Sequence, residues 1–213
     1  CELECLPSLG KLQNLKSLYL SNLVKLEYME TPPETISEHG EASGEGLQFF
    51  PRLERLTLRD LPNLKEWCGK SGERMGGDDS ITRHQPYQLS FVCSKLTNLS
   101  ISSCCNLTSF PQCPNIETLF LFDFNERLRI ISNTTCSLKL RRVEIDNVAW
   151  LQSSLSTGSF QFLTDLELHE DKQVKCLGDY GRIFGACFSS LRKLTIWDCS
   201  KLQGVDRRSG GWG

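Results

Sequence analysis

The sequence carries little net charge and few apolar runs, and both shortages exclude classes of function. Its 24 Lys and Arg nearly balance 26 Asp and Glu, so the formal net charge is only −2. A field this weak argues against nucleic acid or an acidic membrane surface as the main partner. No segment approaches the roughly 18 consecutive apolar residues that a membrane-spanning helix needs. Aromatic residues make up only 9 % of the chain and hydrophobic residues 39 %, both modest for a soluble domain.

Catalytic motifs are lacking as well. The sequence contains no G-x-S-x-G, no H-E-x-x-H and no glycine-rich phosphate cradle. The segment Gly69-Lys70-Ser71 is not a phosphate loop, because Leu64 stands where that motif requires a glycine. His169 falls on an expected strand, where a solvated histidine is a better interpretation than a general base. We therefore predict that the chain is not an enzyme, has no catalytic residues and binds no cofactor itself.

Cysteine is abundant, but its spacing indicates neither a metal site nor a disulfide framework. Eleven cysteines are present without a single C-x-x-C pair, and the three histidines are scattered. Structural zinc needs four converging ligands, usually with tight local spacing, so we predict no metal site. Free thiols in a reducing, cytoplasmic compartment are the favoured interpretation. No signal peptide is visible, and because the chain begins at Cys1 rather than Met, we expect it to be a fragment.

Leucine is what the sequence has in excess, at 33 of 213 residues, and it recurs in one register. The register is apolar, two residues, apolar, one residue, apolar. It occurs seven times, at Leu15-Leu18-Leu20, Leu53-Leu56-Leu58, Leu96-Leu99-Ile101, Ile116-Leu119-Leu121, Leu140-Val143-Ile145, Leu163-Leu166-Leu168 and Leu191-Leu194-Ile196. In five of the seven units the pattern extends to two further apolar positions, each three residues on. Arg127 and Asp171 are the two departures, so the repetition exceeds the roughly 0.5 complete units expected by chance.

The register predicts the fold. Its L-x-L core alternates as a strand does, and the flanking positions lie in turns that curl over the same core. Later units are spaced 20 to 28 residues apart, which is in or near the leucine-rich-repeat period. We predict an α/β solenoid, a leucine-rich-repeat horseshoe with a parallel β-sheet on its concave face and a mostly irregular or short-helical convex side. About seven irregular units fill residues 1–205, with insertions at about 30–48 and 68–90 and a disordered tail at 206–213.

Side chains that alternate with the buried leucines face outward on the concave side and are the candidates for partner binding. Phe120 and Phe122 are unusual there, because an outward-facing aromatic on a strand needs a partner or a covering loop. Aromatic residues dominate the energetics of protein interfaces. The candidate partner-binding residues are Tyr19, Arg59, Ser100, Phe120, Phe122, Glu144, His169 and Trp197.

Several segments resemble the leucine-rich repeats of plant intracellular nucleotide-binding disease resistance proteins of the coiled-coil type. Residues 6–18 resemble the L-P-x-L-G-x-L-x-x-L-K-x-L signature of that family, and residues 50–58 its F-P-x-L-E-x-L-x-L segment. Residues 63–67 resemble its tryptophan-bearing stretch, and residues 101–107 and 196–202 its x-x-C-x-x-L turn. The resemblance covers nearly all of residues 1–205.

This resemblance implies a function. The chain would be a C-terminal repeat region that recognises a pathogen effector, or a host protein that an effector has altered, in the defence response. It would also restrain a nucleotide-binding module, and ADP or ATP would bind only that missing upstream domain. Protein partners are therefore expected, without nucleic acid and without a membrane span.

Two alternatives remain open. The first is the substrate-recognition repeat of an F-box ubiquitin-ligase adaptor. The second is an extracellular receptor ectodomain, which the three sequons at Asn98, Asn106 and Asn133 favour on paper. Secreted plant repeats, however, carry a regular ladder of asparagines along the sequence, and this sequence shows no such regular pattern.

Overall fold

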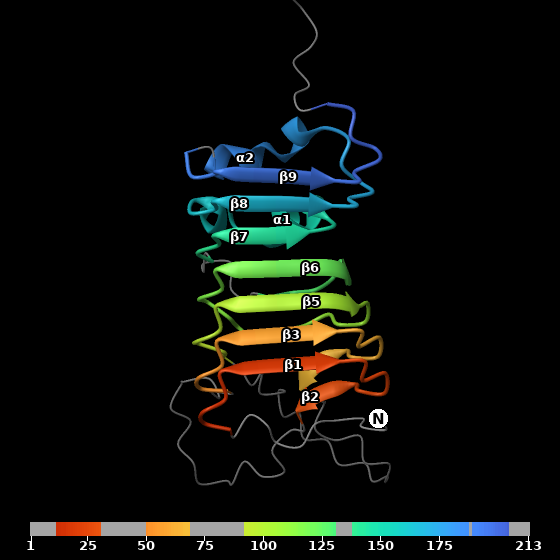
Figure 1. The fold of residues 1–213 in the computed structure, drawn as a ribbon, viewed down its shortest axis with the longest axis vertical. Coiled ribbons are helices and arrows are strands. Elements are labelled where there is room, and N and C mark those ends of the chain that lie inside the picture. Colours follow the sequence, from red (N-terminus) through yellow and green to blue (C-terminus); the bar gives the residue numbers. More distant parts are fainter. Residues whose placement is uncertain (1–11, 31–49, 69–91, 131–137, 188, 205–213) are drawn as a thin grey trace, which may run out of the picture.

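The computed structural model describes residues 12–30, 50–68, 92–130, 138–187 and 189–204, and these form a mostly parallel α/β fold. Its centre is a seven-stranded sheet in the order β1-β3-β5-β6-β7-β8-β9, so that successive strands of this sheet are neighbours in space (Figure 1). The strands are β1 (Ser17–Ser21), β3 (Arg55–Arg59), β5 (Asn98–Cys104), β6 (Thr118–Phe124), β7 (Arg142–Ile145), β8 (Asp165–His169) and β9 (Lys193–Trp197). The predicted class, α/β with a parallel sheet, is confirmed; the two expected insertions and the tail lie almost wholly outside the described residues.

The strand register follows the sequence register. Leu56 of β3 pairs with Leu99 of β5, and Leu99 pairs with Leu119 of β6. The second position of all seven sequence triplets forms one such row across the sheet, and the third position forms another. These side chains point to one side and are fully buried from β3 to β8. The core is therefore a continuous apolar layer along one face of the sheet, as period-2 alternation requires.

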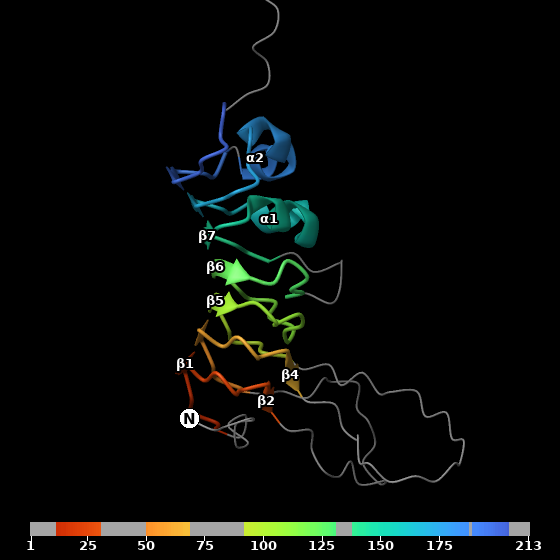
Figure 2. The same cartoon turned by 90° about the vertical axis from the view of Figure 1, so that its right-hand side faces the viewer.

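The two faces of the sheet differ. Short helices, turns and a small second sheet cover the apolar face, whereas the opposite face is open (Figure 2). The covering elements are β2 (Tyr28–Glu30) paired with β4 (Glu66–Cys68), helix α1 (Val148–Ser154), helix α2 (Gly181–Cys187) and the 3₁₀ turns η2 (Thr157–Phe160) and η3 (Leu177–Tyr180). No helix in the described part of the chain is long and apolar enough to cross a membrane.

The turn after each strand returns the chain to the core at a constant spacing, with one exception. Leu107 donates its N–H to the carbonyl of Cys104 at 3.1 Å, and equivalent bonds recur in other units. In the fourth unit the donor is Leu128, which bonds the carbonyl of Asn125 at 2.9 Å and is only 1 % exposed. One inserted residue therefore moves the buried position from Arg127 to Leu128. The departure of Arg127 from the sequence pattern is therefore a one-residue shift of the buried position along the chain.

Asparagine side chains link neighbouring turns. Asn63 Nδ2 donates to the carbonyl of Val24 at 2.6 Å, and Asn106 Nδ2 donates to that of Pro62 at 2.6 Å. Asn125 continues the series with a 2.7 Å bond to the carbonyl of Cys105. These bonds link neighbouring turns, but they come from two different positions of the unit, because Asn125 stands three residues before its buried leucine and the other two stand directly before theirs.

A left-handed residue marks the end of most strands. Two residues after the last core-facing strand position, six of the seven units have φ between 46° and 58°. The residues are Asn22, Asp60, Ser103, Asp123, Glu170 and Asp198. Asn and Asp tolerate this conformation because their short side chains bond locally, whereas longer side chains suffer the clash between Cβ and the carbonyl. Glu170 is consequently the most strained of the six.

We expect Glu170→Gly to stabilise the fold by about 1 kcal/mol, because glycine adopts the φ of 49° at this exposed position without a Cβ clash. The same change at Glu66, inside strand β4, should instead destabilise by roughly 0.5–1 kcal/mol through backbone entropy. Urea denaturation followed by circular dichroism measures both changes. Equal losses for the two variants would contradict the strain argument.

Candidate functional site

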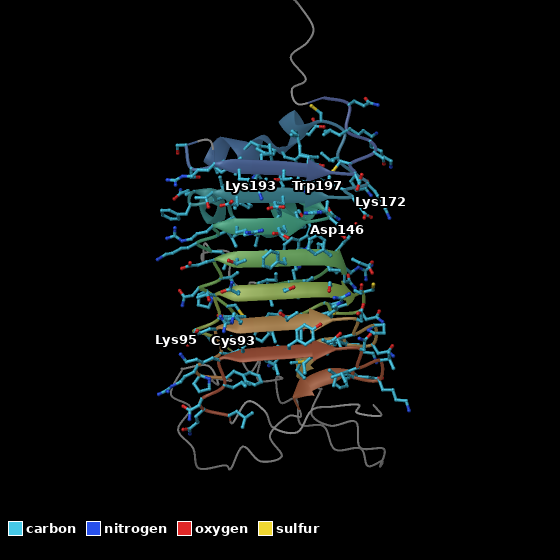
Figure 3. The ribbon with its side chains drawn as sticks, in the orientation of Figure 1. Cys93, Lys95, Asp146, Lys172, Lys193 and Trp197 are labelled. Carbon is cyan, nitrogen blue, oxygen red and sulfur yellow. The ribbon has the colours of Figure 1, made fainter. Side chains whose placement is uncertain are left out.

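The open face of the sheet holds the candidate side chains in two rows. The first row runs through the strand centres and contains Tyr19, Ser100, Phe120 and Glu144, which stand in register across β1, β5, β6 and β7. The second row lies two residues further along the strands and contains Arg59 with Phe122, and His169 with Trp197. Figure 3 looks onto this face and places Lys193 and Trp197 on β9, with Asp146 nearer the carboxyl ends of the strands.

Aromatic contacts join the second row. The ring of Phe122 meets His169 edge to face, with centroids 5.5 Å apart and an interplanar angle of 81°. His169 stacks on Trp197 at 6.3 Å and 23°. Trp197 itself remains 54 % exposed. The imidazole is therefore held between two aromatic side chains that come from β6 and β9, and one of them presents a large apolar surface to solvent.

The first row contains charge as well as an aromatic ring. The guanidinium of Arg142 lies 5.8 Å from the centroid of the Phe120 ring, a distance at which the ring quadrupole attracts a cation. Arg142 Nε also donates to Glu144 Oε1 at 3.0 Å. Phe120 is half-buried by these same-face neighbours. The outward orientation of Phe120 and Phe122 is thus partly explained by contacts within the sheet face.

Glu167 lies at the centre of the charged group, although the sequence did not single it out. It stands beside Glu144 in the register of β7 and β8 and is only 8 % exposed. Lys193 Nζ donates to Glu167 Oε1 at 2.6 Å, and Arg142 approaches the same oxygen at 3.4 Å. The hydrogen bond from Lys193 lowers the pKa of Glu167, and its burial opposes this effect. These two cations offset the repulsion that directly opposed like charges produce.

His169 was predicted to be a solvated strand histidine, and in the structure it lies on β8 and is only partly exposed. Its side chain is 33 % exposed and Nε2 lies 3.7 Å from Glu167 Oε2. Nε2 is itself buried from water and has no hydrogen-bond partner in the structure. Together with Glu144 and Glu167 it forms a group whose potential metal-ligating atoms lie within 4.8 Å of one another. The expectation of no metal site rested on spacing along the chain, whereas this group converges from two strands.

Not every predicted residue joins this cluster. Tyr19 is 61 % exposed on β1, the first strand of the sheet. Arg59 pairs with its neighbour Asp60 at 3.2 Å, and Ser100 lies one strand away from Phe120. The structure therefore gathers Phe120, Phe122, Glu144, His169 and Trp197 on β6 to β9 and leaves the other three on β1 to β5.

A hollow adjoins the cluster at the carboxyl ends of β6, β7 and β8. Its volume is about 370 Å³, and half of its lining residues are acidic. The residues are Asp123, Phe124, Glu126, Asp146, Asn147, Glu170, Lys172 and Gln173. Burial raises the pKa of Asp146, and the nearby Asp123 and Asp171 carboxylates add to the increase. This end of the open face therefore has an acidic character beside the aromatic row.

The cysteines play a structural part in the described region. Cys104 is fully buried, and its thiol donates to the carbonyl of Ser102 at 3.3 Å. Burial raises its pKa to about 11, so the reactive thiolate is disfavoured. Seven of the described cysteines, among them Cys104, are free thiols. Cys104 thus fills the core at the end of β5.

Searches for similar proteins identify no relative: no family model, no curated protein and no solved structure matches the chain.

Proposed function

We propose that the chain is the leucine-rich-repeat region of a plant intracellular immune receptor and that it binds a protein on the open face of its sheet. The partner is a pathogen effector or a host protein that an effector has altered. The same region restrains a nucleotide-binding module of the receptor in the cytoplasm. Seven units with one register of buried positions support the repeat solenoid, and the family resemblance supports the biological setting.

One observation carries the proposed binding function. Trp197 is 54 % exposed and stacks on His169, which in turn contacts Phe122. A large aromatic side chain that is anchored on one side and open on the other is typical of an interface hot spot. The surrounding Arg142, Glu144, Glu167 and Lys193 supply a polar rim that fixes orientation and specificity. A flat sheet face with this composition offers a protein surface contact area without the enclosed pocket that a small ligand requires.

The test uses the full-length receptor that the resemblance implies, expressed in leaf tissue with its effector. We expect Trp197→Ala and Phe122→Ala each to weaken effector-dependent cell death and co-precipitation by about tenfold or more, since truncating a hot spot costs roughly 2 kcal/mol. Phe162→Ala is the matched control, because Phe162 is also about half exposed, at 51 %, but lies outside strands β6 to β9. Receptor abundance is measured alongside. Unchanged recognition in both strand variants would exclude this face as the binding surface.

A further inference from the structure

Glu144, Glu167 and His169 form a group of potential metal ligands, and this observation does not depend on the proposed function. Each contributes one potential ligand atom, and the three atoms lie within 4.8 Å of one another. Zinc bonds to nitrogen and oxygen are about 2.0–2.2 Å long, so the ligands of one ion stand within about 4 Å of one another. The 3.7 Å between His169 Nε2 and Glu167 Oε2 already meets this condition. We propose that these three residues form a binding site for a divalent transition-metal ion.

The histidine supplies the observation that points to a ligand. Its Nε2 is buried from water and unpartnered in the structure, and a buried polar atom without a partner is costly. The ring cannot turn freely to find water, because it lies edge-on to Phe122 and stacked on Trp197. A metal ion placed between Nε2 and the carboxylates satisfies this nitrogen and uses the orientation that the two aromatic rings impose.

The neighbouring cations are compatible with the site at Glu167, because both of them contact the carboxylate oxygen that does not face His169. Lys193 Nζ contacts Oε1 of Glu167, and Arg142 contacts Oε1 of Glu144. His169 faces Oε2 of Glu167. Lys193 and Arg142 would therefore act as the outer hydrogen-bond donors that orient metal-ligating carboxylates.

Electrostatic competition does not exclude an ion. Lys193 and Arg142 neutralise the two glutamates, but their side chains are 53 % and 46 % exposed. The carboxylates are largely buried, but both cations keep about half of their side chain in water, so each can shift toward solvent when an ion binds. The imidazole and two carboxylates match the donor preferences of Mn²⁺ to Zn²⁺ and leave positions open for water or a partner's side chain.

The full chain is titrated with Co²⁺, whose absorption spectrum distinguishes thiolate from nitrogen and oxygen ligands. We expect a bound ion with a nitrogen and oxygen spectrum in the wild type. His169→Gln and Glu144→Gln should each weaken its affinity by about tenfold or more. Glu117→Gln is the control, because Glu117 is also a glutamate in an arginine ion pair but is more exposed and lies outside the cluster, and it should leave the affinity within about twofold.

Circular dichroism spectra verify that the variants fold. Two ligand variants are measured, so that the proposal is still tested if one of them fails to fold. A spectrum that shows only thiolate ligands would assign the ion to the cysteines and overturn the proposal. So would equal affinity of the wild type and both ligand variants, or no binding by the folded wild type. Because the measurement requires no partner protein, loss of effector recognition and loss of metal binding are independent outcomes.

Discussion

Replacing Asp171 by leucine should destabilise the protein by about 3 kcal/mol or more, although leucine fits the repeat better. The carboxylate of Asp171 is fully buried. Its Oδ1 accepts the N–H groups of Gln173 and Val174 at 2.8 and 2.9 Å, and its Oδ2 accepts that of Val148 at 2.7 Å. Leucine would leave the buried N–H groups of Val148 and Val174 unpaired, at roughly 1–3 kcal/mol each, and would also remove the acceptor of the part-buried Gln173 N–H. The gain from burying its apolar side chain, about 1.5–3 kcal/mol, does not compensate.

The bond to Val148 makes Asp171 more than a turn residue. Val148 is the first residue of α1, and its N–H cannot be satisfied within the helix. Asp171 thus connects the turn after β8 to the helix of the preceding unit. The milder substitution Asp171→Asn keeps one oxygen acceptor in place, so it should cost an intermediate amount of stability.

Arg127→Leu is the matched control. It also restores an apolar residue to the sequence pattern, but Arg127 is exposed because the core position has moved to Leu128. We expect a change within about 0.5 kcal/mol. The urea midpoint of each variant, followed by circular dichroism, gives the comparison. A midpoint for Asp171→Leu equal to or above that of the wild type would mean that the turn donors find other partners.

Asp171 and Arg127 show which parts of the fold can be predicted from the sequence and which cannot. The strands were predictable because every unit repeats the same apolar pair, so that Leu56, Leu99 and Leu119 stand side by side. A polar residue such as Asp171 looks like a failure in a pattern that records only hydrophobicity. Its role depends on backbone donors in its own turn and in the preceding unit, which have no signature in the sequence.

The candidate site was predicted only in part, because the sequence pattern gives the face on which a residue lies but not the residues that it contacts. Outward strand positions could be read from the alternation, and this identified Phe122, His169 and Trp197 correctly as residues of the open face. Which of them touch depends on side-chain lengths and rotamers across four strands. Glu167 was overlooked as a site residue, yet a signal existed. Once the units are aligned on Val143 and Leu166, Glu144 and Glu167 occupy the same position, and a repeated carboxylate beside a histidine is unusual.

Leu119→Ala should destabilise the protein by about 2–5 kcal/mol, the range for a leucine truncated in a packed core. Leu119 is fully buried between Leu99 on β5 and Val143 on β7. Leu194 is the matched control, since it occupies the same position of the repeat on β9. There it pairs with Leu166 on one side and remains 42 % exposed.

Leu194→Ala should therefore cost only about 1 kcal/mol, because much of the side chain is already in water and little cavity forms. Urea denaturation of both variants measures the difference. Both substitutions replace leucine by alanine at the same position of the repeat. A difference between the two losses of stability therefore measures how closely neighbouring strands pack around each leucine. A similar loss at both positions would show that β9 is as fully enclosed in solution as β6, and that the apolar surface at this end of the sheet is covered.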